Sequence, residues 1–133
     1  MNEPVVIDNQ TIQNKIFTIR NTQVMIDRDL AVLYEVEPKR LNEQVKRNIQ
    51  RFPEKFCFQL SEYEANELVA NCDRFKSLKH STSFPYAFTE QGVSMLSAVL
   101  RSQTAIEVSI KIMDSFVNMR KFLSQNASLF TRI

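Results

Sequence analysis

Pro38 and Pro53 bracket the segment that most narrows what this chain can fold into. Proline is tolerated in the first turn of a helix and ends a helix that reaches it, so the pair predicts one helix between the two. Apolar residues recur at helical spacing within that span, at Leu41, Val45, Ile49 and Phe52. Upstream, Asp27 is a predicted N-cap for a helix that runs to about Tyr34. The sequence therefore predicts two short helices joined by a tight turn over residues 27–52.

The second helix of this pair carries two polar stripes beside its apolar seam. On a wheel of about 100° per residue, the stripe that flanks the seam holds Arg40, Gln44, Arg47 and Arg51. The stripe opposite the seam holds Lys39, Glu43, Lys46 and Gln50. Arginine and lysine can bond guanine, glutamine can bond adenine, and both cations neutralise phosphates. Such a helix suits reading of duplex DNA, although an amphipathic basic helix is about as often only a solvated face.

Positive charge is concentrated in this segment, whereas the chain as a whole is nearly neutral. The formal net charge of +2 is too small to indicate a polyanionic partner. Residues 1–36 hold three basic and five acidic side chains, but residues 37–55 hold six basic and three acidic ones. This asymmetry is expected if one face meets phosphate. The predicted DNA-binding residues are Lys39, Arg40, Gln44, Lys46, Arg47 and Arg51.

The turn between the two helices departs from the usual helix-turn-helix pattern at one position. That pattern has a small residue in the first helix, an apolar residue in the turn and an apolar residue within the second helix. At these positions the chain has Ala31, Val36 and Leu41. The usual turn glycine is replaced by Glu35. A glutamate there must adopt an unfavourable backbone geometry, or the turn must differ.

Short strands and further helices are predicted around the helix pair. Residues 16–26 predict a β-hairpin that turns at Asn21-Thr22, and residues 56–60 predict a short strand. Ser61 and Glu64 form a predicted capping box for a helix to about Asn71, with inward positions at Tyr63, Leu68 and Val69.

The second half of the chain is predicted to be mostly helical. Residues 73–83 have no periodicity and predict a polar loop, which is followed by an extended segment at 84–88. Thr89 is a predicted cap for the next helix. A long last helix is expected from about Thr104 to Leu123, opened by a capping box of Thr104 and Glu107.

These elements predict an α+β fold: a helix-rich single domain with an N-terminal β-hairpin, a helix-turn-helix-like pair, short additional strands and a long C-terminal helix. The domain is expected to span residues 1–133, with a core at 16–123 and flexible ends at 1–12 and 125–133. A sandwich rich in tight turns is disfavoured because the chain has one glycine. That glycine, Gly92, is expected where two backbones approach closely.

Two weaker interaction surfaces are also predicted. The polar loop carries Arg74, Lys76 and Lys79, which could touch phosphate or the minor groove, although a solvated loop is the commoner explanation. Helix-turn-helix proteins usually act as dimers. The long last helix could supply a homodimer contact through surplus apolar positions, with Ile112, Met119 and Phe122 as the candidates.

Several classes of function are disfavoured by what the sequence lacks. No apolar run approaches the roughly 18 residues of a membrane span, and the first ten residues do not resemble a secretory signal. Cys57 and Cys72 have no CxxC spacing, so two reduced thiols in a cytoplasmic protein are expected. One histidine, no glycine-rich phosphate loop and no zinc-ligand cluster predict neither catalysis nor a metal, cofactor or small-molecule substrate.

Two long strings of this chain resemble a known family. They are IRNTQVMIDRDLAVLYEVEPKRLNEQVKRNIQRFPEKFCFQL at residues 19–60 and PYAFTEQGVSMLSAVLRSQTAIEVSIKIMDSFVNMR at residues 85–120. Both resemble the phage "ORF six N-terminal" DNA-binding domain, which is allied to the KilA-N and BRO-N domains. The resemblance implies a double-stranded DNA-binding domain of phage or prophage origin. Such domains often stand at the N-terminus of regulators or antirepressors, and here a separate effector domain is expected to be missing.

A second hypothesis belongs to another class of function. The chain could be an antirepressor-like protein-interaction module whose basic helix meets an acidic surface on another regulator. Salt would weaken both kinds of complex, but only a DNA reader would show a steep salt dependence with duplex DNA.

Overall fold

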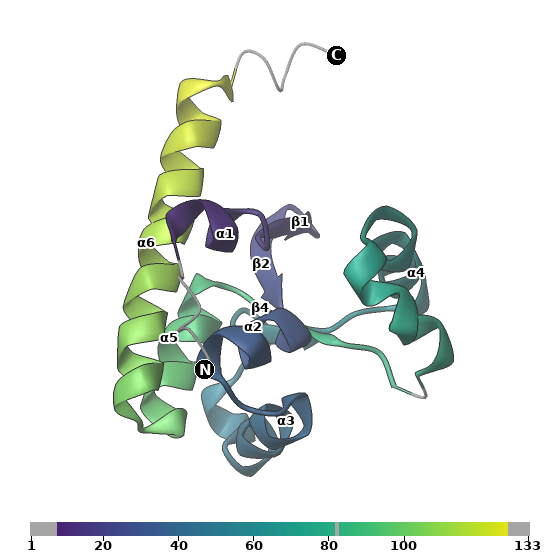
Figure 1. Ribbon diagram of the computed structural model, residues 1–133, viewed down its shortest axis with the longest axis vertical. Coiled ribbons are helices and arrows are strands. Elements are labelled where there is room, and N and C mark those ends of the chain that lie inside the picture. The colour runs from purple at the N-terminus through teal and green to yellow at the C-terminus, as the bar shows by residue number, and fades with distance from the viewer. Residues whose placement is uncertain (1–7, 82, 128–133) are drawn as a thin grey trace, which may run out of the picture.

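The computed structural model describes residues 8–81 and 83–127 and confirms the expected helix-rich α+β class (Figure 1). Its α-helices are α1 (Asn9–Gln13), α2 (Asp27–Tyr34), α3 (Pro38–Arg47), α4 (Glu62–Asn71), α5 (Glu90–Leu100) and α6 (Gln103–Gln125). Its 3-10 helices are η1 (Ile49–Arg51) and η2 (Asp73–His80). Its strands are β1 (Phe17–Ile19), β2 (Thr22–Ile26), β3 (Cys57–Gln59) and β4 (Tyr86–Phe88).

The four strands form one antiparallel sheet in the order β1-β2-β4-β3. Successive side chains of a strand point to opposite faces, so the sheet supplies two separate cores. Met25, Cys57 and Phe88 pack with α2, α3, α5 and α6. Val24, Ile26 and Ala87 pack with α4 and η2 on the other side. The sheet is therefore a thin central layer, with α4 on one side and α5 and α6 on the other (Figure 1).

The predicted hairpin is present, but its turn lies one residue earlier than expected. Phe17 pairs with Val24 and Ile19 pairs with Thr22, which leaves Arg20 and Asn21 as the two turn residues. Both have positive φ angles, 55° and 57°. Two positive φ angles are characteristic of the type I′ turn, whose twist matches that of the strands.

Helix caps account for most helix starts, and two of the predicted caps are shifted. Ser61 and Glu64 form the expected capping box, and Thr89 caps α5 through the backbone N–H of Gly92. Asp27 is the first residue of α2 and Ile26 is its cap position, so the predicted N-cap at Asp27 is wrong by one residue. Ser102, rather than Thr104, caps α6 by accepting from the N–H of Ala105 at 3.0 Å.

Gly92 lies where α5 passes the backbone that precedes β3, as expected. A Cβ atom at this position would overlap the carbonyl oxygen of Phe56. That oxygen also accepts the backbone N–H of Thr89 at 3.0 Å, which holds the two segments together. Glycine is therefore required here by close packing and not by its φ angle.

Two sequence-based expectations about burial and local structure are corrected. Tyr63 is 73% exposed, whereas Leu68 and Val69 are buried as predicted. Residues Asp73–His80 form the 3-10 helix η2 where a loop was expected, because Phe75 and Leu78 are buried against the sheet. The expected flexible end at residues 1–12 reaches into α1, whose Ile12 is buried.

The predicted homodimer contact on the last helix is also corrected at one position. Ile112 is fully buried in the core and cannot meet a second chain. Met119 is half-buried and Phe122 is exposed. Ile106 and Ile110 lie exposed on α6. Of the predicted flexible ends 1–12 and 125–133, residues 1–7 and 128–133 lie outside the described residues. In the described part of the chain, no helix is long and apolar enough to cross a membrane.

Candidate nucleic-acid interface

α2 and α3 are joined by the three residues Glu35, Val36 and Glu37. Glu35 has φ 59° and ψ 41°, the left-handed conformation that glycine usually supplies at a helix end. The backbone N–H of Val36 donates to the carbonyl of Ala31 at 3.0 Å, as in a Schellman-type helix end. The expectation that Glu35 takes an unfavourable backbone geometry is thus confirmed.

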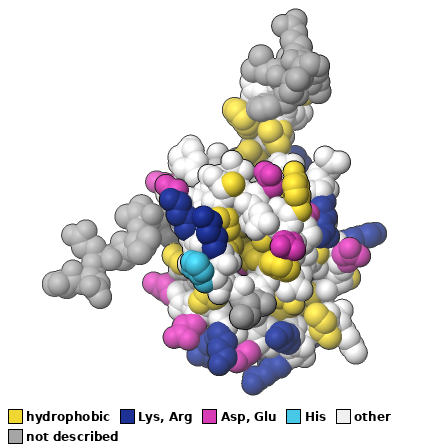
Figure 2. All heavy atoms as spheres, turned by 90° about the vertical axis from the view of Figure 1, so that its right-hand side faces the viewer, with side chains coloured by type: hydrophobic (Ala, Val, Ile, Leu, Met, Phe, Trp, Pro, Cys, Tyr) yellow, Lys and Arg dark blue, Asp and Glu magenta, His cyan; other side chains and the backbone are white. Residues whose placement is uncertain are grey.

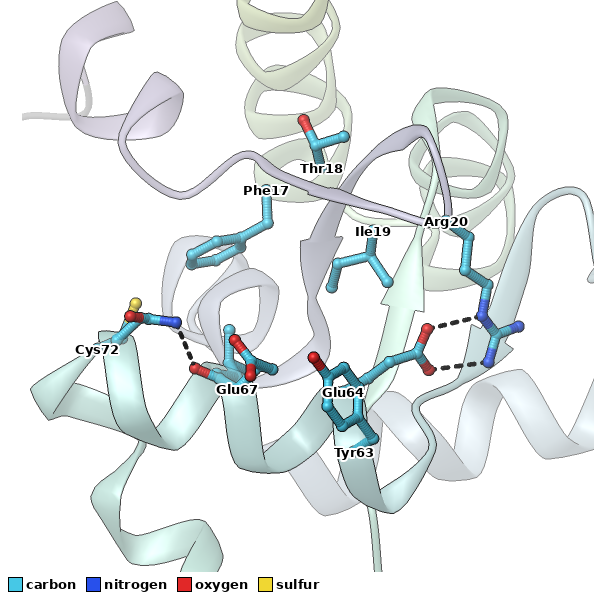
Figure 3. Close-up of a pocket in the computed structure, with 10 residues that line it drawn as sticks. Phe17, Thr18, Ile19, Arg20, Tyr63, Glu64, Glu67 and Cys72 are labelled. Atoms are coloured by element: carbon cyan, nitrogen blue, oxygen red, sulfur yellow. Dashed lines mark hydrogen bonds and ion pairs between the residues drawn. The ribbon is translucent and has the colours of Figure 1, made fainter. Parts of the chain in front are cut away.

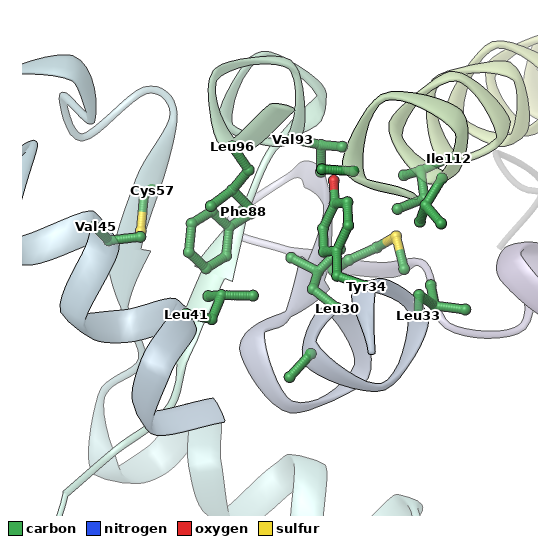
Figure 4. Close-up of a cluster of buried hydrophobic side chains, with 14 of the residues drawn as sticks. Leu30, Leu33, Tyr34, Leu41, Val45, Cys57, Phe88, Val93, Leu96 and Ile112 are labelled. Atoms are coloured by element: carbon green, nitrogen blue, oxygen red, sulfur yellow. The ribbon is translucent and has the colours of Figure 1, made fainter. Parts of the chain in front are cut away.

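The apolar side of α3 is anchored in the core shared by α2, α5 and α6. Leu41 and Val45 are buried, and they point toward Phe88 and Cys57 of the sheet (Figure 4). Asn42 adds a polar anchor, because its Nδ2 donates to the carboxylate of Asp27 at 3.1 Å. These contacts fix the rotation of α3 about its axis, and hence which of its polar stripes is exposed.

α3 is shorter than the sequence predicts. It ends at Arg47, and Asn48, with φ −120° and ψ 33°, leads into the 3-10 helix η1. The side chain of Asn48 donates to the carbonyl of Gln44 at 2.8 Å, a local bond that competes with helix continuation. Ile49, predicted to lie in the apolar seam, is instead 61% exposed, while Phe52 returns to the core.

The predicted site residues of the flanking stripe come together around three adjoining hollows. The first, of about 430 Å³, is lined by Glu37, Lys39, Arg40, Glu43, Gln44 and Arg47. The second, of about 440 Å³, is lined by Gln44, Arg47, Asn48, Arg51, Ala98, Val99 and Arg101. The third, of about 300 Å³, lies between α3 and the start of α6 and includes Arg40 and Gln44. Gln44 thus lies at the centre of this surface. Lys46 is exposed on α3 but lines none of these three hollows.

The eight arginines in the described part of the chain divide into two equal groups. One group is engaged within the protein: Arg20 with Glu64, Arg28 with Ser77, Arg74 with Asp29, and Arg120 with Glu90. In the other group no side chain has a hydrogen-bond or ion-pair partner among the described residues: Arg40, Arg47, Arg51 and Arg101. All four of this second group line the hollows beside α3. Unneutralised cations are therefore gathered on one surface.

Carboxylates lie on this surface too, but at its edge. Glu37 and Glu43 line the first hollow, whereas no carboxylate lines the second one. Figure 2 shows Lys and Arg side chains with acidic ones among them at the lower end of the molecule, the level at which Figure 1 places α3, and others beside the histidine and at the right edge. The region between α3 and the α5–α6 turn is consequently its most cationic part.

The predicted secondary contact residues do not join this surface. Arg74 donates to both carboxylate oxygens of Asp29 at 3.0 Å and lies 4.6 Å from the centre of the Phe75 ring, so its guanidinium is used to hold η2 against α2. Lys76 pairs with Asp73 at 3.2 Å, and Lys79 is exposed. None of the three lines a hollow beside α3.

Arg101 is the site residue that sequence reasoning missed. A helical wheel compares residues of one helix, so it cannot bring in a turn 50 residues further along the chain. In the structure Arg101 occupies the α5–α6 turn with φ 50° and ψ 39°. Its exposed side chain faces the same hollow as Arg47 and Arg51.

A larger hollow of about 500 Å³ lies elsewhere, between β1 and α4 (Figure 3). Phe17, Ile19 and Leu68 give it an apolar floor. Arg20 bonds both oxygens of Glu64 at one end, at 2.8 and 2.9 Å. This partner lowers the pKa of Glu64 to about 2 and keeps the carboxyl ionised. The Arg20 guanidinium is therefore not free to bind a phosphate, and the Glu64 carboxyl is not poised to transfer protons near neutral pH.

Comparisons with known proteins give one family and no individual relative. The model of the ORF6N domain matches residues 14–99, which run from the segment before β1 to nearly the end of α5. No curated protein and no solved structure matches the chain. The matched range contains α3 and the three arginines Arg40, Arg47 and Arg51, and it stops before Arg101.

Proposed function

The chain belongs to the ORF6N domain family, and we propose that it is the DNA-binding module of a phage- or prophage-type transcriptional regulator that acts in the bacterial cytoplasm. One observation carries this proposal. The arginines without a partner in the described structure are the ones that line the surface beside α3. Exposed like charges repel one another, and a polyanion relieves that repulsion while releasing its own counterions.

The α2–α3 pair serves in this proposal as a helix-turn-helix, with α3 in the major groove. The second helix of such a pair lies in the major groove, where its exposed side chains reach base edges. Arg40, Gln44 and Arg47 lie along the exposed side of α3 and are the base-reading candidates. Lys39, Lys46 and Arg51 would mainly hold phosphates, because a lysine acts as a point charge and Arg51 lies beyond the end of α3.

The anchoring of α3 supports this assignment of roles. The side of α3 that carries Leu41 and Val45 is buried, and Asn42 is bonded to Asp27. The two polar stripes are therefore the ones available to the major groove of DNA. A recognition helix needs a fixed orientation, since base contacts depend on hydrogen-bond geometry of about 3 Å. The buried seam supplies that orientation without using any of the cations.

A second candidate is a protein-interaction module that binds another regulator. Ile49 favours it, because this residue is 61% exposed between Arg47 and Arg51. An apolar side chain among cations suits an acidic protein surface with a hydrophobic centre. A homodimer through α6 is a further proposal, and Ile106 and Ile110 are the exposed positions that would carry it.

Titration of a labelled random-sequence duplex pool at two salt concentrations separates the two candidates. The DNA reader predicts binding at low salt and a steep loss at higher salt. Arg47→Ala is expected to cost about 1–3 kcal/mol if Arg47 reads a base. Arg120→Ala is the matched control, because Arg120 is bound to Glu90 and lies outside the α3 surface. Absence of duplex binding by folded protein at low salt would exclude the DNA-binding proposal.

A further inference from the structure

Three separate elements deliver arginines to the hollow at the end of α3. Arg47 comes from the last turn of α3, Arg51 from η1 and Arg101 from the turn between α5 and α6. All three side chains are exposed, and none has a hydrogen-bond or ion-pair partner within residues 8–81 and 83–127. The hollow has a volume of about 440 Å³, and no carboxylate lines it. An uncompensated cluster of this kind is complementary to an anion.

The backbone of Arg101 gives a second, independent observation. Its φ of 50° lies in the left-handed region, where residues other than glycine, asparagine and aspartate are uncommon. An arginine at this position therefore costs stability relative to glycine. Residues with strained backbone conformations cluster at functional sites, where the side chain's role in binding or catalysis outweighs the cost of the strain.

The turn that presents Arg101 is fixed on both sides. The backbone N–H of Arg101 donates to the carbonyl of Ser97, and Ser102 caps the start of α6. α5 and α6 are themselves packed into the core through Leu96 and Ala105. The Arg101 side chain consequently starts from a rigid backbone, which reduces the ordering cost of binding an oxyanion.

We propose that Arg51 and Arg101 together clamp one backbone phosphate of the duplex DNA that α3 contacts. This inference rests on the proposed function, and one of its two residues, Arg101, lies outside the residues that the family model matches. Arginine presents paired N–H donors that fit two phosphate oxygens. A phosphate held between η1 and the α5–α6 turn fixes how α3 enters the groove, since phosphate contacts set register and orientation while base contacts set sequence.

The substitution Arg101→Gly tests the clamp without depending on a destabilised protein. Glycine removes the guanidinium and also relieves the left-handed strain, so the variant should unfold at the same temperature as the wild type or a higher one. A random-sequence 20-base-pair duplex is titrated over a series of salt concentrations. The clamp predicts that the slope of log K against log[salt] becomes shallower by about one, and that binding weakens equally for all sequences.

Two further variants sharpen the outcome. Arg101→Lys keeps the charge and loses the paired donors, so it should restore the salt slope but not the full affinity. Lys121→Ala removes one positive charge about 30 Å along α6 from the turn, and it should leave the slope unchanged. A wild-type slope in Arg101→Gly, or an equal change in Lys121→Ala, overturns the clamp while duplex binding by the wild type still stands. Failure of the wild type to bind duplex would overturn the proposed function itself.

Discussion

Asn42 in α3 donates a hydrogen bond from its Nδ2 to the buried carboxylate of Asp27, the first residue of α2, at 3.1 Å. The same carboxylate accepts the backbone N–H of Tyr86 in β4 at 3.2 Å. One buried group therefore ties both helices of the pair to the sheet. Burial raises the pKa of Asp27, and the hydrogen bonds from Tyr86 and Asn42 oppose that rise.

Replacing Asn42 by alanine should loosen this tie. A buried carboxylate that loses a donor is destabilised, so the free energy of unfolding at neutral pH should fall by about 1–3 kcal/mol. Because the folded-state pKa of Asp27 is raised, its contribution to stability is fully present below the unfolded value of 3.8 and is lost as pH rises through the raised pKa. The cost of Asn42→Ala should therefore be larger at pH 7 than at pH 4.

Urea unfolding at the two pH values measures this difference. Asn66→Ala, at an exposed position on α4, is the matched control and should change stability by less than about 0.5 kcal/mol. A cost for Asn42→Ala that is independent of pH would show that the bond to the Asp27 carboxylate is not the cause.

Gly92→Ala should destabilise the junction between α5 and the segment that precedes β3. The added Cβ overlaps the Phe56 carbonyl oxygen, which is backbone and cannot rotate away. Overpacking of this kind costs about 1–3 kcal/mol or more, whereas Ser94→Ala on the exposed side of α5 should be nearly neutral. Thermal unfolding compares the two variants, and an equal melting temperature for both would refute the close approach.

Glu35→Gly should stabilise the protein. Relief of the left-handed conformation gains about 1–2 kcal/mol, and the greater freedom of glycine in the unfolded chain takes back about 0.4–1 kcal/mol. The expected net gain is up to about 1.5 kcal/mol by these two principles. Glu35→Ala is the control that removes the same side chain but keeps the strain, so it should bring no comparable gain. If both variants gain equally, the cause lies in the carboxylate and not in the backbone.

Glu64 should contribute to the acid sensitivity of the fold. Its bond with Arg20 lowers the folded-state pKa to about 2, below the unfolded value of 4.5. The stabilisation is therefore present above pH 4.5 and is lost as the pH falls toward 2. Glu64→Gln should be less stable than the wild type at pH 7 and equally stable near pH 2, as followed by chemical unfolding. Glu67→Gln, an exposed neighbour on α4, should show no such convergence.

The parts of the fold that could be predicted from the sequence are those that a local signal determines. The seam through Leu41 and Val45, the capping box at Ser61 and the close approach at Gly92 each depend on neighbours in the chain or on the special geometry of one residue type. The stop at Asn48 was missed because a wheel assumes that the helix continues, and this error placed Ile49 in the core.

The parts of the candidate site that were missed depend on distant partners. Arg74 looked like a free cation in a loop, but its partner Asp29 is 45 residues earlier in the chain. Arg101 has no local sequence signal that links it to α3, yet the fold places its turn beside the end of that helix. Periodicity in a single sequence indicates neither the pairing of Arg74 with Asp29 nor the position of Arg101 beside α3. Both depend on how the sheet and the α5–α6 pair arrange distant segments.

In the proposed function, the exposed cations beside α3, and not the net charge of the chain, bind duplex DNA. The most direct measurement compares Lys39→Gln/Arg51→Gln with Arg120→Gln/Lys121→Gln, which remove the same charge from different surfaces, in salt-dependent titrations of one random-sequence duplex. Loss of two phosphate contacts should make the slope of log K against log[salt] shallower by about two for the first variant, and the second variant should keep the wild-type slope. Equal slopes for the two variants would contradict this role of the cations beside α3.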